Sequence, residues 1–177
     1  MKKIFIIAGH QKGTGACSYI EEGAEAIFLK NEISRILRSK NIDVYNDDDD
    51  DKLTQVVDDL KSKVLKNDIC IDIHFNSSSN INTSGTEVFI PNNYTIDEFN
   101  LASELKDIIV SVLQTKNRGV KTEDMTYLKK IAMLSNFDCC NILLEICFVS
   151  NKQDVEKYNK NKYILADKLA QKIINFL

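Results

Sequence analysis

The sequence lacks the features of chains that cross membranes or bind nucleic acids. Among its 177 residues, no apolar run approaches the roughly 20 residues that a membrane-spanning helix needs. The net charge is −3, and no basic stripe is present to neutralise phosphate groups. We therefore expect no nucleic-acid partner and no membrane insertion.

The sequence also lacks a disulfide framework and a complete signal peptide. The five cysteines are odd in number and form neither a disulfide framework nor a C-x-x-C pair. Cys70 and Cys147 lie inside apolar, strand-like runs, so they are expected to pack as small hydrophobes in a protein made in a reducing compartment. The apolar run at residues 4–7 is too short for the hydrophobic region of a signal peptide.

What remains is the pattern of a single α/β domain with a mainly parallel sheet. Hydrophobic residues make up 44% of the chain and charged residues 28%, and no repeat or linker interrupts it. Short β-branched runs alternate with segments of helical periodicity. Strands are predicted at residues 3–8, 42–45, 69–73, 85–90, 127–134 and 141–147, and helices at residues 25–39, 52–66, 96–116, 152–157 and 160–176. Residues 117–119 are predicted to form a turn, and the acidic residues 47–51 a solvated turn rather than a calcium loop, because the spacing does not fit one.

The chain has only two histidines, and each follows an apolar strand. His10 comes after the first predicted strand, and His74 comes directly after residues 69–73. In open α/β sheets, ligands collect beyond the carboxyl ends of the strands. Two histidines at one sheet edge therefore predict a metal site, with strand capping as the alternative.

Glu145 lies in the middle of an apolar strand, where an unpaired carboxylate is costly to bury. A zinc hydrolase needs three protein ligands, an open position for water, and a nearby carboxylate that moves a proton. The two histidines and a carboxylate from the first helix would supply the ligands, and Glu145 the base. The alternative is that Glu145 pairs with a buried lysine or arginine.

Seven short runs occur in the order typical of one enzyme family. They are residues 7–10 (IAGH), 15–16 (GA), Glu25 at the start of a helix, 73–76 (IHFN), 85–88 (GTEV), 118–121 (RGVK) and 143–151 (LLEICFVSN). In this register the chain resembles zinc-dependent N-acetylmuramoyl-L-alanine amidases of the Amidase_3 type, found in bacterial autolysins and phage endolysins. The resemblance covers nearly the whole chain.

The resemblance implies a catalytic domain spanning residues 1–177, with a mixed, mostly parallel six-stranded sheet and helices on both faces. It implies one Zn²⁺ ion held by His10, Glu25 and His74, with Glu145 as the catalytic acid/base and Asn76 in contact with the substrate. The reaction would hydrolyse the amide between N-acetylmuramic acid and the L-alanine of peptidoglycan. A zinc peptidase that cuts elsewhere in the stem peptide and a non-catalytic wall-binding relative remain alternatives.

We expect a monomer that is made in the cytoplasm without a signal peptide and acts on the cell wall after release or export. A phage lysis enzyme, an autolysin and a sporulation enzyme all fit this expectation.

The third ligand is chosen from three neighbouring glutamates: Glu21, Glu22 and Glu25. Glu25 opens the predicted helix and precedes Phe28 and Leu29 by three and four residues, so it should share their sheet-facing side. Glu22 would share that side only if the helix began earlier, which Gly23 disfavours because glycine weakens helix interiors. Glu25 is therefore the predicted ligand, with Glu22 and a purely helix-stabilising Glu25 as the alternatives.

Overall fold

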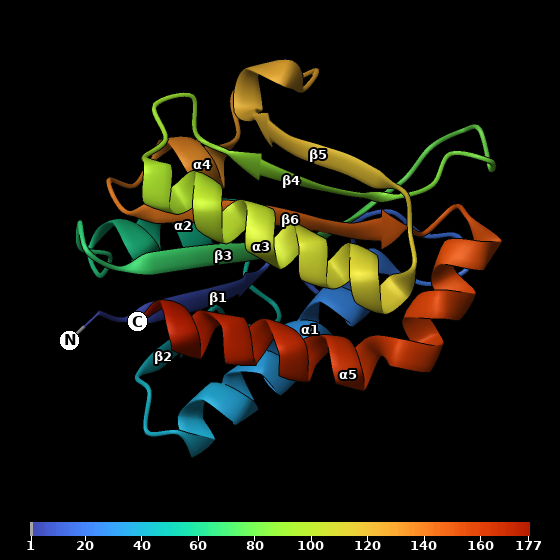
Figure 1. Ribbon diagram of the computed structural model, residues 1–177. Helices are drawn as coiled ribbons and strands as arrows, with labels where there is room; N and C mark the ends of the chain where they lie inside the picture. The colour runs from blue at the N-terminus through green and yellow to red at the C-terminus, as the bar shows by residue number, and fades with distance from the viewer. Residues whose placement is uncertain (1) are drawn as a thin grey trace.

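Six strands form one sheet in the order β2-β1-β3-β6-β4-β5 in the computed structural model, which describes residues 2–177 (Figure 1). The strands are β1 (Ile4–Ala8), β2 (Val44–Asn46), β3 (Ile69–Asn76), β4 (Thr86–Ile90), β5 (Asn117–Thr122) and β6 (Cys140–Phe148). The helices are α1 (Glu22–Ser39), α2 (Leu53–Lys61), α3 (Ile96–Leu113), α4 (Ala132–Ser135) and α5 (Lys152–Phe176), with a 3₁₀ helix η1 (Glu123–Met125).

The sheet is mixed and mostly parallel, as the sequence predicts. Strands β2, β1, β3 and β6 are parallel to one another, whereas β4 is antiparallel to β6 and β5 is parallel to β4. The carboxyl ends of β1, β3 and β6 therefore meet at one edge of the sheet.

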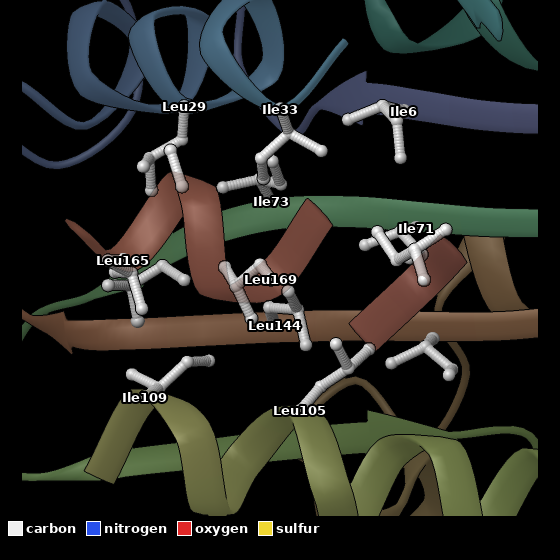
Figure 2. Close-up of a cluster of buried hydrophobic side chains, with 14 of the residues drawn as sticks. Ile6, Leu29, Ile33, Ile71, Ile73, Leu105, Ile109, Leu144, Leu165 and Leu169 are labelled. Carbon is white, nitrogen blue, oxygen red and sulfur yellow. The ribbon is translucent and has the colours of Figure 1, made fainter. Parts of the chain in front are cut away.

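Helices cover both faces of the sheet, and the larger core lies beneath α1, α3 and α5. Strand β1 and residues 69–73 of β3 are buried throughout, which explains why both are apolar except for Asp72. Figure 2 shows side chains of the three helices converging on the strands: Leu29 and Ile33, Leu105 and Ile109, and Leu165 and Leu169. A smaller core lies on the opposite face, between α2 and Met133 of α4. None of the described helices combines the length and apolarity needed to cross a bilayer.

Helix α5 is one helix of 25 residues, although the sequence predicts two with a break near residue 158. Tyr158 continues the helix because its side chain is fully buried and its ring packs edge-on against Phe75 of β3. The side chain of Asn151 caps the helix by accepting a hydrogen bond from the backbone N–H of Asp154.

The predicted strand at residues 127–134 is wrong, as is the predicted turn at residues 117–119. Those three residues begin β5, where Gly119 has a φ of +91° and the register with β4 shifts, as in a bulge. The chain after η1 instead forms a loop and then α4. Tyr127 and Leu128, which suggested the start of a strand, are 97% and 73% exposed and do not pack against the sheet.

The acidic segment at residues 47–51 is only partly solvated. Lys30 of α1 is 1% exposed, and its ammonium group lies 3.2 Å from Asp47 Oδ1 and 2.7 Å from Asp49 Oδ1. Asp47 Oδ1 also accepts a hydrogen bond from the backbone N–H of Ala8, at the end of β1. Burial raises the pKa of Asp47 to about 6, against the opposing effect of Lys30. This ion pair fixes the end of β1 two residues before His10.

We expect Lys30→Met to lower the free energy of unfolding by about 3–5 kcal/mol at pH 8, because it leaves a buried carboxylate unpaired. The loss should shrink at pH 5, below the pKa of Asp47, where the carboxyl takes up a proton and is less costly to bury. Urea unfolding at the two pH values measures both effects. Lys168→Met, at an exposed position of α5, is the control and should change stability by less than about 0.5 kcal/mol. Equal losses in the two variants would contradict this account.

Candidate metal centre and active site

The two strand-end histidines meet at the sheet edge, as their positions in the sequence predict. His10 follows β1 and His74 lies near the end of β3, and their ring centroids are 5.1 Å apart in an edge-on arrangement. A Cβ atom on Gly9 would lie 2.0 Å from His74 Nε2, so only glycine lets the chain after β1 pass this ring.

Glu22, the first residue of α1, joins the two histidines. Its Oε1 lies 3.1 Å from His74 Nδ1 and 3.5 Å from His10 Nε2. The carboxylate also accepts backbone hydrogen bonds from Phe75 (3.1 Å) and Ala16 (2.8 Å). Burial raises the pKa of Glu22, but these hydrogen bonds and the charge of His74 outweigh it and lower the pKa below its usual value. Glu22 is thus held as an anion at the centre of the group.

The prediction of Glu25 at this position is corrected by the structure. The Glu25 carboxylate accepts a hydrogen bond from the Tyr158 hydroxyl at 2.9 Å and pairs with Lys162 at 3.0 Å, both on α5. It therefore ties α1 to α5, away from the histidines. The helix begins at Glu22, three residues earlier than predicted, and Gly23 in its first turn does not prevent this. A Cβ on Gly23 would lie 2.5 Å from the Gln11 carbonyl oxygen, so the glycine admits the loop that carries His10.

His10, Glu22 and His74 could together hold a metal ion. Each offers one ligand atom, and these atoms lie within 4.8 Å of one another. Two imidazole nitrogens and one carboxylate oxygen form a donor set that suits zinc and leaves a position open for a further group. Burial lowers the pKa of His10, which favours the neutral form that binds metals.

Glu145 lies beside this group without a partner of its own. It is paired in register with His74 across β3 and β6 and with Glu87 across β4 and β6. Its Oε2 is buried and makes no hydrogen bond to residues 2–177. Burial raises the pKa of Glu145 to about 8, and the neighbouring Glu22 and Glu87 carboxylates add to the shift. The alternative of a structural ion pair to a buried lysine or arginine is not found in the described part of the chain.

Asp72 is a site residue that the sequence analysis misses. It is 2% exposed, and its Oδ2 lies 3.1 Å from His74 Nε2, on the far side of the ring from Glu22. Its Oδ1 is buried and finds no hydrogen-bond donor within residues 2–177. Asp72 precedes His74 by two residues, so the period-2 alternation of a strand places both on one face. That spacing is the signal that would have found it.

A second ion cluster lies beside Glu145 and includes Asn76. Glu87 is 5% exposed and contacts Arg118 at 3.0 Å and Lys121, which together lower its pKa against the effect of burial. The side-chain amide of Asn76 donates to Glu87 Oε1 at 2.6 Å. Asn76, the predicted substrate contact, thus lies on the site's surface with its orientation set by Glu87.

These groups line one cleft of about 680 Å³. His10, Asp72, His74 and Glu145 line it together with residues of the segment that runs from η1 to α4. No cysteine lines this cleft. Cys147 lies in β6 but is fully buried in the larger core.

Known proteins resemble this chain in sequence and in fold. Residues 4–177 match the Amidase_3 family, which is described as N-acetylmuramoyl-L-alanine amidase. The chain is 28% identical over 178 residues to the uncharacterized protein YqiI of Bacillus subtilis (strain 168), covering 98% of this chain and 82% of that protein. It is 33% identical over 109 residues to an uncharacterized cell wall amidase of Bacillus anthracis, but that match covers 58% of this chain and 19% of the relative.

Solved structures share the fold. An N-acetylmuramoyl-L-alanine amidase from Clostridium difficile 630 superposes with a TM-score of 0.80 at 22% identity, covering 99% of this chain and 96% of that one. The catalytic domain of CwlV, an N-acetylmuramoyl-L-alanine amidase from Bacillus (Paenibacillus) polymyxa var. colistinus, gives a TM-score of 0.82 at 20% identity and covers 99% and 98% of the two chains. At these identities the likeness shows the fold.

We expect Asp72→Asn to lower the pKa of His74 in the metal-free protein. Burial alone would lower that pKa, but Asp72 and Glu22 raise it well above the usual value, so removing one negative charge favours the neutral ring. An NMR titration of the histidine ring measures the change. Asp68→Asn is the control. Asp68 is a buried carboxylate just before β3, but it accepts hydrogen bonds from the backbone N–H groups of Lys3 and Leu65 and not from His74. An unchanged His74 pKa in Asp72→Asn would contradict this interpretation.

Proposed function

Because the chain belongs to the Amidase_3 family of N-acetylmuramoyl-L-alanine amidases, we propose that His10, Glu22 and His74 hold one Zn²⁺ ion in its active site. The activity is hydrolysis of the amide between N-acetylmuramic acid and L-alanine in peptidoglycan. The observation that carries the proposal is the convergence of the three ligand atoms beside Glu145, a carboxyl group with no other partner.

The zinc proposal rests on the donor set and on the way it is held. Glu22 is fixed by backbone N–H groups from two segments, and His74 is held between Glu22 and Asp72. Such outer contacts orient metal ligands and set which ring nitrogen faces the ion. A bound zinc ion supplies Lewis-acid polarisation of the scissile carbonyl and acidifies water.

Glu145 is proposed as the group that moves the proton. Without a metal the pKa of Glu145 is raised to about 8. A neighbouring divalent cation would lower it toward the neutral range, where a general acid–base residue works best. As a carboxylate it takes a proton from the attacking water, and as a carboxylic acid it delivers one to the departing L-alanine amine. Its register beside His74 supports this role, because it lies next to one proposed ligand and is not itself one of the three.

Asn76 is proposed to contact the substrate. It lies on β3 two residues beyond His74 and lines the same cleft as Glu145. Because Glu87 accepts from its NH₂ group, its carbonyl oxygen is oriented to accept a hydrogen bond from a substrate N–H or O–H.

We expect Glu22→Gln to weaken zinc binding and Glu25→Gln to leave it intact. Loss of a direct ligand should exceed the roughly 10–100-fold loss that is typical when an outer partner of a ligand is removed. Competition with a chromophoric chelator measures both affinities. Glu25→Gln is a matched control on the same helix, because Glu25 contacts Tyr158 and Lys162 instead. Weaker zinc binding in Glu25→Gln with normal binding in Glu22→Gln would restore the ligand predicted from the sequence.

We expect Glu145→Gln to bind zinc normally and to lose about 10²–10⁴-fold in turnover of purified walls, because the amide keeps the shape but cannot take up a proton. Mass analysis of the digest tests the reaction itself, which should yield peptides with a free L-alanine amine. Glu156→Gln, at an exposed position of α5, should keep wild-type activity. Turnover within about threefold of wild type in Glu145→Gln would reject this role.

A further inference from the structure

The cleft extends well beyond the proposed metal site. One continuous cavity joins His10, His74 and Glu145 to the segment that runs from η1 to α4. We call residues 124–130 the rim loop. Figure 1 shows the chain at this point coiling beyond the end of β5, above the edge of the sheet. A substrate bound at Glu145 therefore has a second surface available within the same cleft.

The rim loop is held at its base. Glu123 is 4% exposed, and its Oε2 accepts hydrogen bonds from the Ile131 backbone N–H at 2.7 Å and from the Ser135 hydroxyl. One buried carboxylate thus joins the two ends of the loop. Within the loop, the Lys129 ammonium group donates to the Asp124 carbonyl oxygen at 2.9 Å.

Only some residues of the rim loop face the cleft. Met125, Thr126, Leu128 and Lys130 line it, whereas Tyr127 and Lys129 do not. Leu128 is 73% exposed, so this wall offers an apolar side chain to a ligand rather than to the core. In each of two neighbouring pairs, Tyr127 with Leu128 and Lys129 with Lys130, only the second residue faces the cleft.

The cleft also contains an uncommitted positive charge. Lys121 lines it, but its ammonium group contacts Glu87. Lys130 is exposed at the cleft wall and takes part in none of the ion pairs found among residues 2–177. Lys130 can therefore pair with an anionic group of a ligand.

We propose that Leu128 and Lys130 form a subsite for the stem peptide beyond the scissile amide, with Lys130 pairing with a free carboxylate of that peptide. This proposal rests on the proposed function. The peptide is the favoured occupant because it continues from the L-alanine amine that leaves at Glu145 and carries carboxylates, whereas the sugar side of the amide carries no comparable charge. Leu128 contacts alkyl groups of the peptide while Lys130 selects for its charge.

The test compares two synthetic muramyl peptides, one with free side carboxylates and one with the same carboxylates amidated. Lys130→Glu should lower kcat/KM for the anionic peptide by about three- to tenfold, mainly through KM, because a partly exposed charge contact is modest and screened by salt. It should change kcat/KM for the amidated peptide by less than about twofold. Lys129→Glu, one residue away and directed elsewhere, should behave as wild type on both.

The apolar contact has its own matched pair. Leu128→Ser should raise KM for both peptides, since alkyl contacts do not depend on the carboxylates, whereas Tyr127→Ser should leave KM unchanged. Equal effects of Lys130→Glu and Lys129→Glu, or an equal loss on both peptides, would overturn the subsite.

A binding measurement separates this proposal from the proposed function. In the Glu145→Gln background, calorimetry with the anionic peptide should show weaker binding when Lys130→Glu is added and unchanged binding when Lys129→Glu is added. A wild-type protein that cleaves neither peptide would reject the proposed function, and the same calorimetry would still decide the subsite. Equal affinity in Glu145→Gln with and without Lys130→Glu would reject the subsite even if the amidase activity is present.

Discussion

The Glu22 carboxylate connects the parts of the chain that build the site. It receives N–H groups from the loop before α1 and from β3, and it lies against both histidines. A buried anion with these donors fixes the start of α1 relative to the end of β3. The position of α1 and the geometry of the proposed metal site are thus set by the same side chain.

The site concentrates negative charge around His74. Asp72, Glu22 and Glu145 all raise its pKa against the effect of burial. Burial raises the pKa of Glu145 to about 8, and the neighbouring carboxylates add to that shift. Two carboxyl oxygens in this group, Asp72 Oδ1 and Glu145 Oε2, are buried without partners among residues 2–177. Buried polar atoms are costly when unsatisfied. A divalent cation at the histidines would offset the charge that these carboxyl groups bring together.

The sequence predicts the layers of this fold well because they depend on local periodicity. Apolar runs place β1, β3 and β6, and the histidines that follow two of them meet at the predicted sheet edge. The edge strand β5 is not predictable in this way. Its residues are only half buried, and Gly119 introduces a positive φ, so its pattern is that of a turn. Its pairing with β4 is a tertiary contact that no short-range signal encodes.

The choice between Glu22 and Glu25 fails for a related reason. Helical spacing predicts that Glu25 lies on the sheet-facing side of α1, but its carboxylate instead meets α5, where Tyr158 and Lys162 donate hydrogen bonds to it. Helix propensity and the observed fold lead to opposite interpretations of Gly23. Propensity alone makes it a helix breaker, whereas the fold uses its missing Cβ to let the His10 loop approach the helix. A glycine just before a predicted helix is therefore better interpreted here as a point of close contact than as a boundary. With that reading, Glu22 becomes the residue placed beside the loop that carries His10.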